Sequence, residues 1–249
     1  MSQRSLAADR LRRAHRGEGL QPAAALADET EAYAVLDDVA RALHWFGEAV
    51  PTHWKSGGPA PCGQHAPLPP AGVRPSPASL SDIRLTLRGI EAEVALRLGE
   101  PVDAARAAGI DRAGALALVD GMAVAIEVVD SRWHEGLDAP PLARLADLLC
   151  HGALVIGTWV PVDRTRDWSA QAGQVRVGDG AWQTFRGSHP MGEPAAVLPA
   201  WLRHATRHGA VLPAGSVVTT GSWCPLLHAA PGDAVEAAFD GIGDARLVF

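Results

Sequence analysis

Two glutamates separated by one residue, Glu91 and Glu93, are the first candidates for chemistry in this sequence. They lie in a stretch between two glycines whose apolar residues occupy every second position: Ile90, Ala92, Val94, Leu96 and Leu98. This alternation predicts a β-strand, so both carboxylates point to the same side of it. Two like charges held so close repel each other unless one is protonated or a cation lies between them. Carboxylate oxygens suit Mg²⁺, Mn²⁺ or Ca²⁺, whereas the simpler alternative is a solvated polar face on an edge strand.

A third acidic residue, Glu127, interrupts a later apolar run. A carboxylate in such a run is costly to bury unless another group compensates for the lost hydration. Its neighbours on the same face, Ala123 and Ala125, are small and leave room beside it. Glu127 therefore suits the third position of a carboxylate-rich cation site. The alternative is an internal ion pair with Arg97 or Arg132.

Lys55 is the next candidate, because it lies between Trp54 and the glycine pair 57–58. Glycine allows a backbone to approach a ligand closely, which would hold the lysine beside it. The alternative is a solvated lysine. The surrounding segment 51–80 is rich in proline and glycine, so we expect little regular structure beyond a short strand. Such a segment is either a functional loop or lid, or a passive linker.

Composition narrows the class of protein. The 249 residues are 47% apolar and 20% charged, which suits a soluble protein with a sizeable core. The net charge of −6 argues against a nucleic-acid surface. We find no 18-residue apolar run, no signal peptide, no P-loop and no Gly-x-Ser-x-Gly elbow. The spacing of the three cysteines fits neither a disulfide framework nor a zinc site; they are Cys62, Cys150 and Cys224. We therefore expect the protein to be located in the reducing cytosol.

The elements that would position these residues follow from caps and periodicity. Residues 2–20 and a second segment from Asp28 or Thr30 to Leu43 predict two helices, which make residues 1–50 a helical N-terminal unit. Residues 51–249 predict a mixed α/β unit, and we expect the two to form one compact domain. In the second half of the chain, the pattern of apolar and turn residues predicts a hairpin around 178–180 and a helix over 195–208. It also predicts a strand over 216–220 and a closing hairpin over 234–249. His204 and His208 on that helix are interpreted as surface histidines or as histidines that interact with the dipole at the C-terminal end of the helix.

The chain resembles the 2-keto-4-pentenoate hydratase/2-oxohepta-3-ene-1,7-dioate hydratase group of the fumarylacetoacetate hydrolase superfamily. The segments that carry the resemblance occur in the family's order: Trp54-Lys55-x-Gly57, Ile90-Glu91-Ala92-Glu93-Val94-Ala95, Ala125-Ile126-Glu127-Val128-Val129-Asp130-Ser131-Arg132, Gly187-Ser188-His189-Pro190, Thr219-Thr220-Gly221-Ser222 and Pro231-Gly232-Asp233. Together they span nearly the whole chain. The resemblance implies a mixed α/β fold with a distorted β-roll or sandwich core, like that of the family's C-terminal domain, flanked by helices.

The resemblance also assigns roles. It implies a Mg²⁺ or Mn²⁺ ion held by Glu91, Glu93 and Glu127, with Lys55 and Glu91 as catalytic residues. Lys55 would orient the substrate carboxylate or carry a proton, helped by a pKa lowered through desolvation. Ser222 would hydrogen-bond the substrate carboxylate. Arg132 is a further substrate-binding candidate, although pairing with a neighbouring carboxylate suits it better.

The implied reaction is hydration of a 2-hydroxydienoate to a 4-hydroxy-2-oxo acid through a metal-stabilised enolate, in the catabolism of aromatic compounds. Decarboxylation of a 4-oxalocrotonate-type 2-oxo-enedioate is the close alternative. Hydrolysis of an acylpyruvate would need a histidine beside a glutamate, and the sequence offers no convincing pair. A non-catalytic partner subunit is a fourth possibility. We expect a homo-oligomer that also associates with a related decarboxylase or hydratase.

The chain departs from the family's pattern after the lysine. Ser56 stands where a hydrophobic residue is expected, and residues 59–80 contain no carboxylate before Asp82. If the family's proton transfers use an acid of that loop, this protein either lacks that acid or replaces it with His53 or His65. The residues after Ser222 are also bulkier than expected, which predicts an altered substrate pocket.

Overall fold

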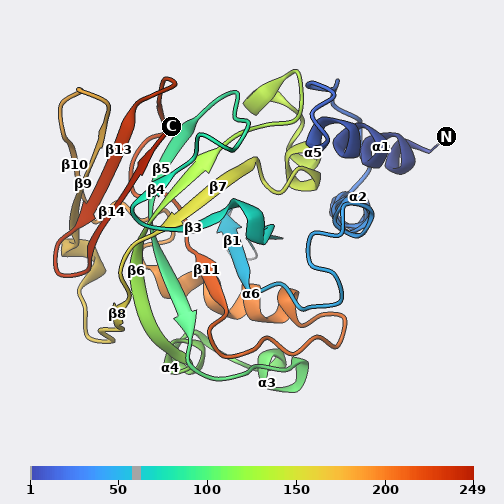
Figure 1. The fold of residues 1–249 in the computed structure, drawn as a ribbon. Coiled ribbons are helices and arrows are strands. Elements are labelled where there is room, and N and C mark those ends of the chain that lie inside the picture. The colour runs from blue at the N-terminus through green and yellow to red at the C-terminus, as the bar shows by residue number, and fades with distance from the viewer. Residues whose placement is uncertain (1, 58–62) are drawn as a thin grey trace.

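Two β-sheets that share an apolar core organise the molecule (Figure 1). The computed structural model describes residues 2–57 and 63–249. Within them, the larger sheet has nine strands, with the order β2-β1-β11-β5-β6-β7-β3, while β12 pairs with β5 and β8 with β6. The smaller sheet has five, in the order β10-β9-β13-β14-β4. The mixed α/β fold expected from the sequence is confirmed.

The strands of the larger sheet are β1 (His53–Gly57), β2 (Gln64–Pro67), β3 (Val73–Pro75), β5 (Gly89–Leu98), β6 (Val119–Val129), β7 (His151–Ile156), β8 (Val160–Pro161), β11 (Val217–Thr219) and β12 (Leu227–His228). Those of the smaller sheet are β4 (Ala78–Ser79), β9 (Ala172–Val177), β10 (Gln183–Arg186), β13 (Ala234–Phe239) and β14 (Gly243–Val248). The α-helices are α1 (Gln3–His15), α2 (Glu29–Ala42), α3 (Ala104–Ala108), α4 (Arg112–Ala117), α5 (Pro141–Ala146) and α6 (Leu198–Ala205). Short 3₁₀ turns are η1 (Pro70–Gly72), η2 (Gly136–Asp138), η3 (Trp168–Ala170) and η4 (Pro194–Val197).

The central strands β5 and β6 have two different faces, as their alternation predicts. On one face, Ile90 and Val94 of β5 and their neighbours join Phe239 and Leu247 of the smaller sheet in the main core. On the other face, small residues such as Ala125 belong to a separate, smaller apolar cluster. This difference matters because the three candidate glutamates lie on that second face.

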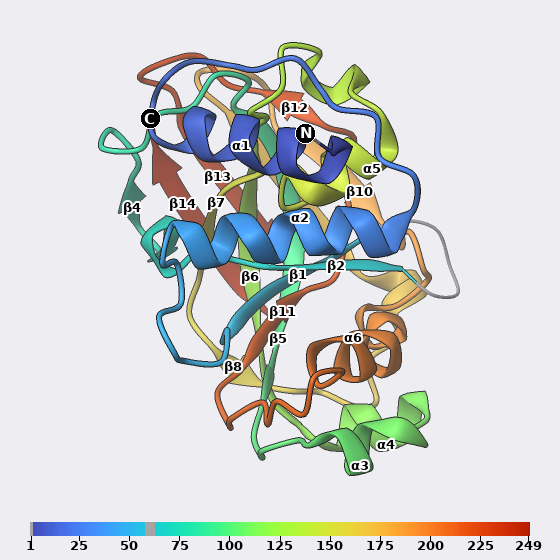
Figure 2. The same ribbon diagram turned by 90° about the vertical axis from the view of Figure 1, so that its right-hand side faces the viewer.

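The N-terminal helices form where the sequence predicts them. Ser2 caps α1 by accepting from the N–H of Ser5, and Asp28 caps α2 by accepting from the N–H of Glu31. Figure 2 shows α1 and α2 lying across one side of the larger sheet. Leu11 of α1 belongs to a second core that also contains α5 residues. These helices therefore brace α5, which borders the candidate site described below.

The segment 51–80 is more regular than we expected. It contributes β1, β2, β3 and β4, and three of these strands pair in parallel with partners far along the chain. Parallel partners are distant in sequence, so local composition does not reveal them. Gly58 and Cys62 of this segment lie outside the described residues, while Cys150 and Cys224 are free thiols.

The helix predicted over 195–208 is shorter and begins differently. The 3₁₀ turn η4 precedes α6, and Pro199 lies in the first turn of α6, where its missing N–H costs no hydrogen bond. His208 is exposed, as expected. The same interpretation is wrong for His204, whose ring is half-buried and packs 4.5 Å from Tyr33 and 5.2 Å from His65.

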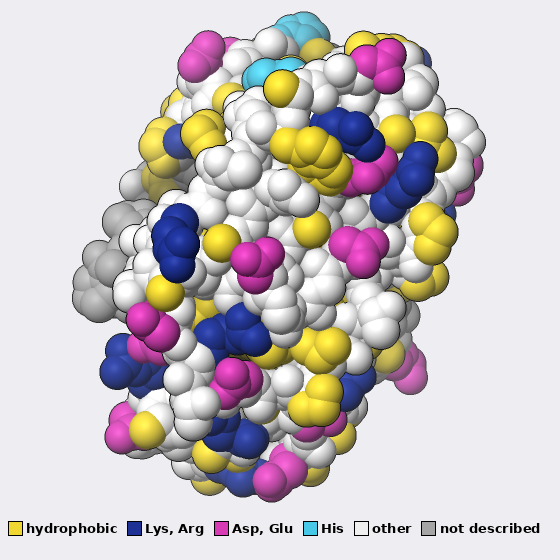
Figure 3. All heavy atoms as spheres, turned by 90° about the vertical axis from the view of Figure 1, so that its left-hand side faces the viewer, with side chains coloured by type: hydrophobic (Ala, Val, Ile, Leu, Met, Phe, Trp, Pro, Cys, Tyr) yellow, Lys and Arg dark blue, Asp and Glu magenta, His cyan; other side chains and the backbone are white. Residues whose placement is uncertain are grey.

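The outer side of the smaller sheet has a mixed surface. Figure 3 shows basic, acidic and hydrophobic side chains interspersed there, without a continuous patch of one kind. None of the helices in the described ranges is both long and apolar enough to span a bilayer.

Candidate metal and substrate site

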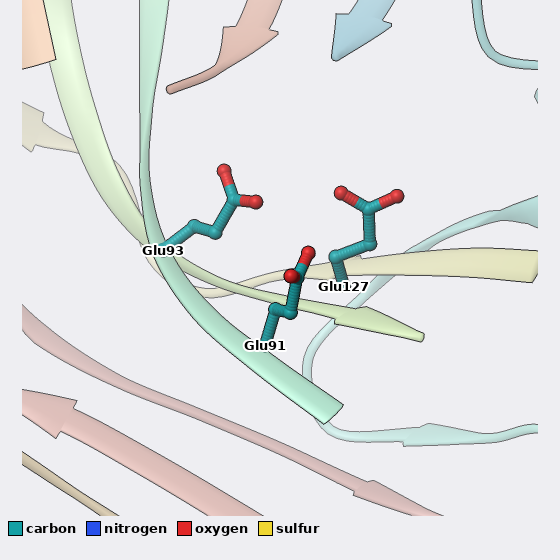
Figure 4. Close-up of side chains that lie close together, drawn as sticks. All are labelled: Glu91, Glu93 and Glu127. Atoms are coloured by element: carbon teal, nitrogen blue, oxygen red, sulfur yellow. The ribbon is translucent and has the colours of Figure 1, made fainter. Parts of the chain in front are cut away.

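Three glutamates converge on the face of the larger sheet that carries Ala123 and Ala125. Glu91 and Glu127 lie directly opposite each other on β5 and β6, and Glu93 follows two residues along β5. One carboxylate oxygen from each lies within 4.8 Å of the others, and Figure 4 shows the side chains pointing into one space. Glu93 and Glu127 are 2% and 0% exposed, and β5 is flanked by β11 and β6. The alternative of a solvated edge strand is therefore wrong.

Glu127 shares one of its oxygens between two nitrogen donors. Lys55 Nζ lies 2.5 Å and His151 Nδ1 lies 3.2 Å from Glu127 Oε1. The second oxygen, Oε2, is buried and has no hydrogen-bond partner among the described residues. The predicted alternative partners are engaged elsewhere, because Arg97 pairs with Asp120 and Arg132 pairs with Asp147. Lys55 is thus a buried ion-pair partner, not a solvated lysine.

Burial and mutual charge set the protonation of this cluster. Burial, with the charges of Glu127 and Glu91 added, raises the pKa of Glu93 well above its usual value. Burial also raises the pKa of Glu91. For Glu127, burial alone would raise the pKa, but the charge of Lys55 and the His151 hydrogen bond lower it. The cluster therefore has two carboxylates whose charged forms are held at a cost, which a bound cation would relieve.

The pKa of Lys55 shifts against our expectation. Burial alone would lower it, but the charges of Glu127, Glu91 and Glu93 outweigh burial and raise it. Lys55 is therefore a charged donor. Two of its N–H groups are used, one by Glu127 Oε1 and one by the Leu149 carbonyl at 3.0 Å.

The turn after β11 holds Glu93 in place. The N–H of Gly221 donates to Glu93 Oε2 at 2.8 Å, and Thr220 Oγ1 donates to the Val94 carbonyl at 2.8 Å. Gly221 has φ +113°, and a Cβ there would lie 3.0 Å from the side chain of Pro190. Only glycine meets both conditions without strain. The Thr-Thr-Gly-Ser segment seen in the sequence thus orients one of the three acids.

An unusual backbone segment holds the lysine. Leu148, Leu149 and Cys150 have φ values of 55°, 55° and 61°, in the left-handed region that costs side-chain-bearing residues about 1–2 kcal/mol each. This turn directs the Leu149 carbonyl to Lys55 Nζ. No feature of the Leu-Leu-Cys sequence predicts such a conformation. Backbone strain of this kind is most often kept where it orients functional groups.

Arg132 braces that turn from both ends. Its Nε donates to Asp147 Oδ1 at 2.5 Å, and its terminal nitrogens donate to the carbonyls of Asp147 and His151. Arg132 does not line the cavity beside the glutamates and instead borders a separate cavity of about 480 Å³. The structure therefore does not bring Arg132 to the other site candidates. It pairs with a carboxylate, as the sequence analysis preferred.

Glu91 and Glu93 line a cavity of about 800 Å³. Polar groups on its wall include Lys55, Glu91, Glu93, Ser222 and Arg144. Much of the remaining wall is apolar and comes from Val129, Leu137, Pro141, Leu149, Met191 and Leu226. A cavity of this size with a few converging polar groups suits a small organic ligand.

Ser222 reaches the cavity, but its hydroxyl is already engaged. Ser222 Oγ donates to the Cys224 carbonyl at 2.8 Å and accepts from the Cys224 N–H at 3.4 Å. A hydrogen bond from Ser222 to a substrate carboxylate would therefore require the hydroxyl to turn. Its role as a substrate ligand stays a prediction.

The two histidines considered as replacements for a loop acid do not reach the cavity. His65 is buried and its Nδ1 lies 2.9 Å from Ser56 Oγ, behind the cavity wall. His53 lies beside Thr52 at the start of β1 and also does not line the cavity. The hypothesis that either histidine supplies the missing group is thus not supported by their positions.

Two residues of the site were missed by sequence reasoning. His151 contacts Glu127 because β7 pairs with β6, and Arg144 lines the cavity because α5 packs beside it. Neither residue belongs to a recognisable motif. Only the pairing of distant segments identifies them.

The donor set fits a divalent cation. It consists of three carboxylates that each bring one oxygen within 4.8 Å of the others, and such oxygen-only sets suit hard cations. Glu127 also has a buried oxygen, Oε2, without a hydrogen-bond partner among the described residues. Glu91, Glu93 and Glu127 are the residues that would hold the ion. Mg²⁺ and Mn²⁺ both accept such ligands.

Comparison with known proteins agrees with this picture. The profile of the fumarylacetoacetate (FAA) hydrolase C-terminal family matches residues 77–248. The chain is 29% identical over 238 residues to 2-keto-4-pentenoate hydratase 1 of Dechloromonas aromatica (strain RCB), covering 90% of this chain and 87% of that protein. It is 29% identical over 163 residues to 2-hydroxyhexa-2,4-dienoate hydratase of Comamonas testosteroni, which is 64% of this chain and 59% of that protein's length.

A solved structure shares the whole architecture. The 4-oxalocrotonate decarboxylase of Pseudomonas putida G7, complexed with magnesium and adipate, superposes with a TM-score of 0.81 at 18% identity. The superposition covers 98% of this chain and 96% of that one. At this identity the likeness establishes the fold.

Proposed function

For this chain, which belongs to the fumarylacetoacetate hydrolase C-terminal family, we propose the activity of a metal-dependent lyase that hydrates a 2-hydroxydienoate. The observation that carries the proposal is the convergence of Glu91, Glu93 and Glu127 beside Lys55, with Glu91, Glu93 and Lys55 on the wall of one cavity. The names of the two hydratase relatives support the choice of reaction. The family resemblance adds the expectation that this reaction serves the catabolism of aromatic compounds, and we include that role in the proposal.

The proposed cofactor is Mg²⁺ or Mn²⁺, held by the three glutamates. When bound, such an ion supplies Lewis acidity, which stabilises negative charge on the C2 oxygen of a 2-oxo acid. The magnesium in the related decarboxylase structure supports this assignment.

In the proposed reaction, the 2-hydroxydienoate first becomes a 2-oxo-enoate as its enol proton moves to the terminal carbon. Water then adds across the remaining double bond, with hydroxyl at C4 and hydrogen at C3. Lys55 binds the substrate carboxylate with the N–H not used by Glu127 and Leu149. Its 2.5 Å contact with Glu127 gives a route for a proton between the cavity and that carboxylate.

A second candidate reaction is decarboxylation of a 2-oxo-enedioate. One observation favours it: apart from Glu91 and Glu93, no carboxylate or histidine among the described residues lines the cavity. Hydration needs a group that accepts a proton from water, whereas decarboxylation breaks a C–C bond and then needs only a proton at carbon. The family resemblance accommodates both.

Acylpyruvate hydrolysis has less support. A histidine does lie beside a glutamate, since His151 contacts Glu127. However, His151 does not line the cavity, so it has no access to a hydrolytic water there.

A direct assay separates these candidates. The purified protein with Mg²⁺ or Mn²⁺ is mixed with a panel of 2-hydroxydienoates, and dienoate absorbance and released CO₂ are followed together. Loss of absorbance without CO₂ is the expected result. Release of CO₂ from a 2-oxo-enedioate, with no turnover of the dienoates, would replace hydration by decarboxylation. Inertness in both assays, with stimulation of a related enzyme, would instead support the non-catalytic partner.

We also propose a homo-oligomer in the cytosol that associates with a related decarboxylase or hydratase. This rests on the family resemblance. Sedimentation velocity of the chain alone, and then with such an enzyme, tests both parts. A monomer that sediments independently of the enzyme would refute them.

A further inference from the structure

Arg144 faces the same cavity as Glu91 and Glu93 and has no counter-ion among the described residues. It lies on α5 and lines the cavity wall. In the described part of the chain, its side chain makes no ion pair and no hydrogen bond, and its Nε is buried without a partner. A guanidinium normally finds acceptors for its five donors, so this one is poised for a group that comes from outside the chain.

Neighbouring cations are committed to carboxylates. Lys55 pairs with Glu127, and Arg132 pairs with Asp147. Cys150, which lies near Arg144, offers no anion because burial raises the pKa of its thiol to about 11. Arg144 is thus the cation of the cavity wall whose charge remains available.

The wall around Arg144 is apolar. Leu137, Pro141 and Leu149 line the cavity close to it in sequence, and Val129 and Leu226 add further hydrocarbon. Such a surface suits a carbon chain and strengthens any charged hydrogen bond made beside it, because water is partly excluded.

We propose that Arg144 binds a second carboxylate of the substrate, so that the preferred substrates are 2-oxo-enedioates or 2-hydroxydienoates with a distal acid group. This inference rests on the proposed function, in which the first carboxylate binds beside Lys55 and the glutamates. Arginine matches a carboxylate with two parallel N–H donors, which gives geometric selection as well as affinity. Arg144 is then a specificity-determining residue that takes no part in the proton transfers.

Binding of two unreactive acids tests the inference. 2-Oxoadipate and 2-oxohexanoate have the same six-carbon chain and 2-oxo acid end, and differ in the distal carboxylate. Their affinities for the protein with Mg²⁺ are measured by isothermal titration calorimetry. A hydrogen bond to a charged group contributes about 1.5–3 kcal/mol, so the wild type should bind 2-oxoadipate roughly ten- to hundredfold more tightly.

Variants assign that preference to a residue. Arg144→Met should remove the preference for 2-oxoadipate, because it weakens the binding of that acid alone. Arg144→Lys keeps the positive charge but loses the two parallel N–H donors of the guanidinium, so it should retain part of the preference. Arg41→Met is the matched control, because Arg41 is exposed and lines neither cavity. Arg144 makes no ion pair with the described residues, so the midpoint of thermal unfolding should be the same in Arg144→Met as in the wild type. If Arg144→Met does not fold, Arg144→Gln takes its place in the experiment.

The outcomes separate this inference from the proposed function. If the wild type binds both acids equally, or if Arg144→Met keeps the preference, the role of Arg144 is refuted while the 2-oxo acid site stands. If neither acid binds the wild type with Mg²⁺ present, both proposals fail.

Discussion

Lys55 Nζ and Glu127 Oε1 form a buried ion pair at 2.5 Å, inside a cluster of three carboxylates. The pair gives the two oxygens of Glu127 different surroundings, since Oε1 meets two nitrogen donors and Oε2 meets none among the described residues. One carboxylate thus serves as the lysine's counter-ion and still keeps a buried oxygen without a hydrogen-bond partner among the described residues. This division connects the stability of the site to its proposed cation binding.

Removing the lysine alone should destabilise the protein strongly. Lys55→Met leaves Glu127 buried without its cation, which typically costs about 3–5 kcal/mol in the free energy of unfolding. The double variant Lys55→Met/Glu127→Gln removes the uncompensated charge, so it should be more stable than Lys55→Met. Urea unfolding without added metal measures the wild type, Lys55→Met, Glu127→Gln and the double variant. If the double variant loses the sum of the two single losses, the pair is not coupled.

Removing one acid should reduce cation affinity without loss of fold. Glu91→Gln should weaken Mn²⁺ binding by at least about a hundredfold, because even changes behind a metal ligand cost about 10- to 100-fold. Burial raises the pKa of Glu91, so the metal-free variant should be no less stable than the wild type. Calorimetry with Mn²⁺ and thermal unfolding measure the two effects. Glu100→Gln, at an exposed carboxylate, is the control, and unchanged affinity in Glu91→Gln would exclude the assigned site.

His151 should act by orienting Glu127. His151→Asn places an N–H close to the position of Nδ1, whereas His151→Leu leaves Glu127 with Lys55 as its remaining side-chain donor. Mn²⁺ affinity should fall about 10- to 100-fold in His151→Leu and much less in His151→Asn. The ¹⁵N spectrum of His151 should show the proton on Nδ1, since the geometry pairs that nitrogen with a carboxylate. Equal losses in both variants would argue for simple packing.

Acid should destabilise the protein through His204. Burial lowers the pKa of His204 to about 2, against about 6.5 in an unfolded chain. Between these values the unfolded state binds the extra proton, so stability is lost as the pH falls below about 6.5. The contribution between pH 7 and pH 5 is up to about 2 kcal/mol.

A variant isolates this contribution. His204→Phe keeps a ring beside Tyr33 and removes the titrating group, so its unfolding free energy should fall less between pH 7 and pH 5 than that of the wild type. His208→Phe, at an exposed position just beyond α6, should follow the wild type. Parallel losses in all three proteins would show that His204 is not responsible.

Local patterns predicted much of the fold because their causes are local. Alternation in β5 predicted a shared face for Glu91 and Glu93, and the side chains of Ser2 and Asp28 cap the two N-terminal helices. The segment 51–80 was less predictable, since its strands β1, β3 and β4 form only by pairing with distant strands. Proline and glycine content indicates turns but carries no information about such partners.

The sequence by itself determined which acids share a face, which residues fill the core and which family the chain resembles. Periodicity, capping and motif order are properties of consecutive residues, so they can be read without coordinates. Only the tertiary structure decided that Lys55 pairs with Glu127, that His151 supports it and that Arg144 Nε has no partner within residues 2–57 and 63–249. These relations depend on strand register and on how α5 packs. Register and packing are set by the burial of the whole core, because a shift of one residue would turn every side chain of a strand to the other face.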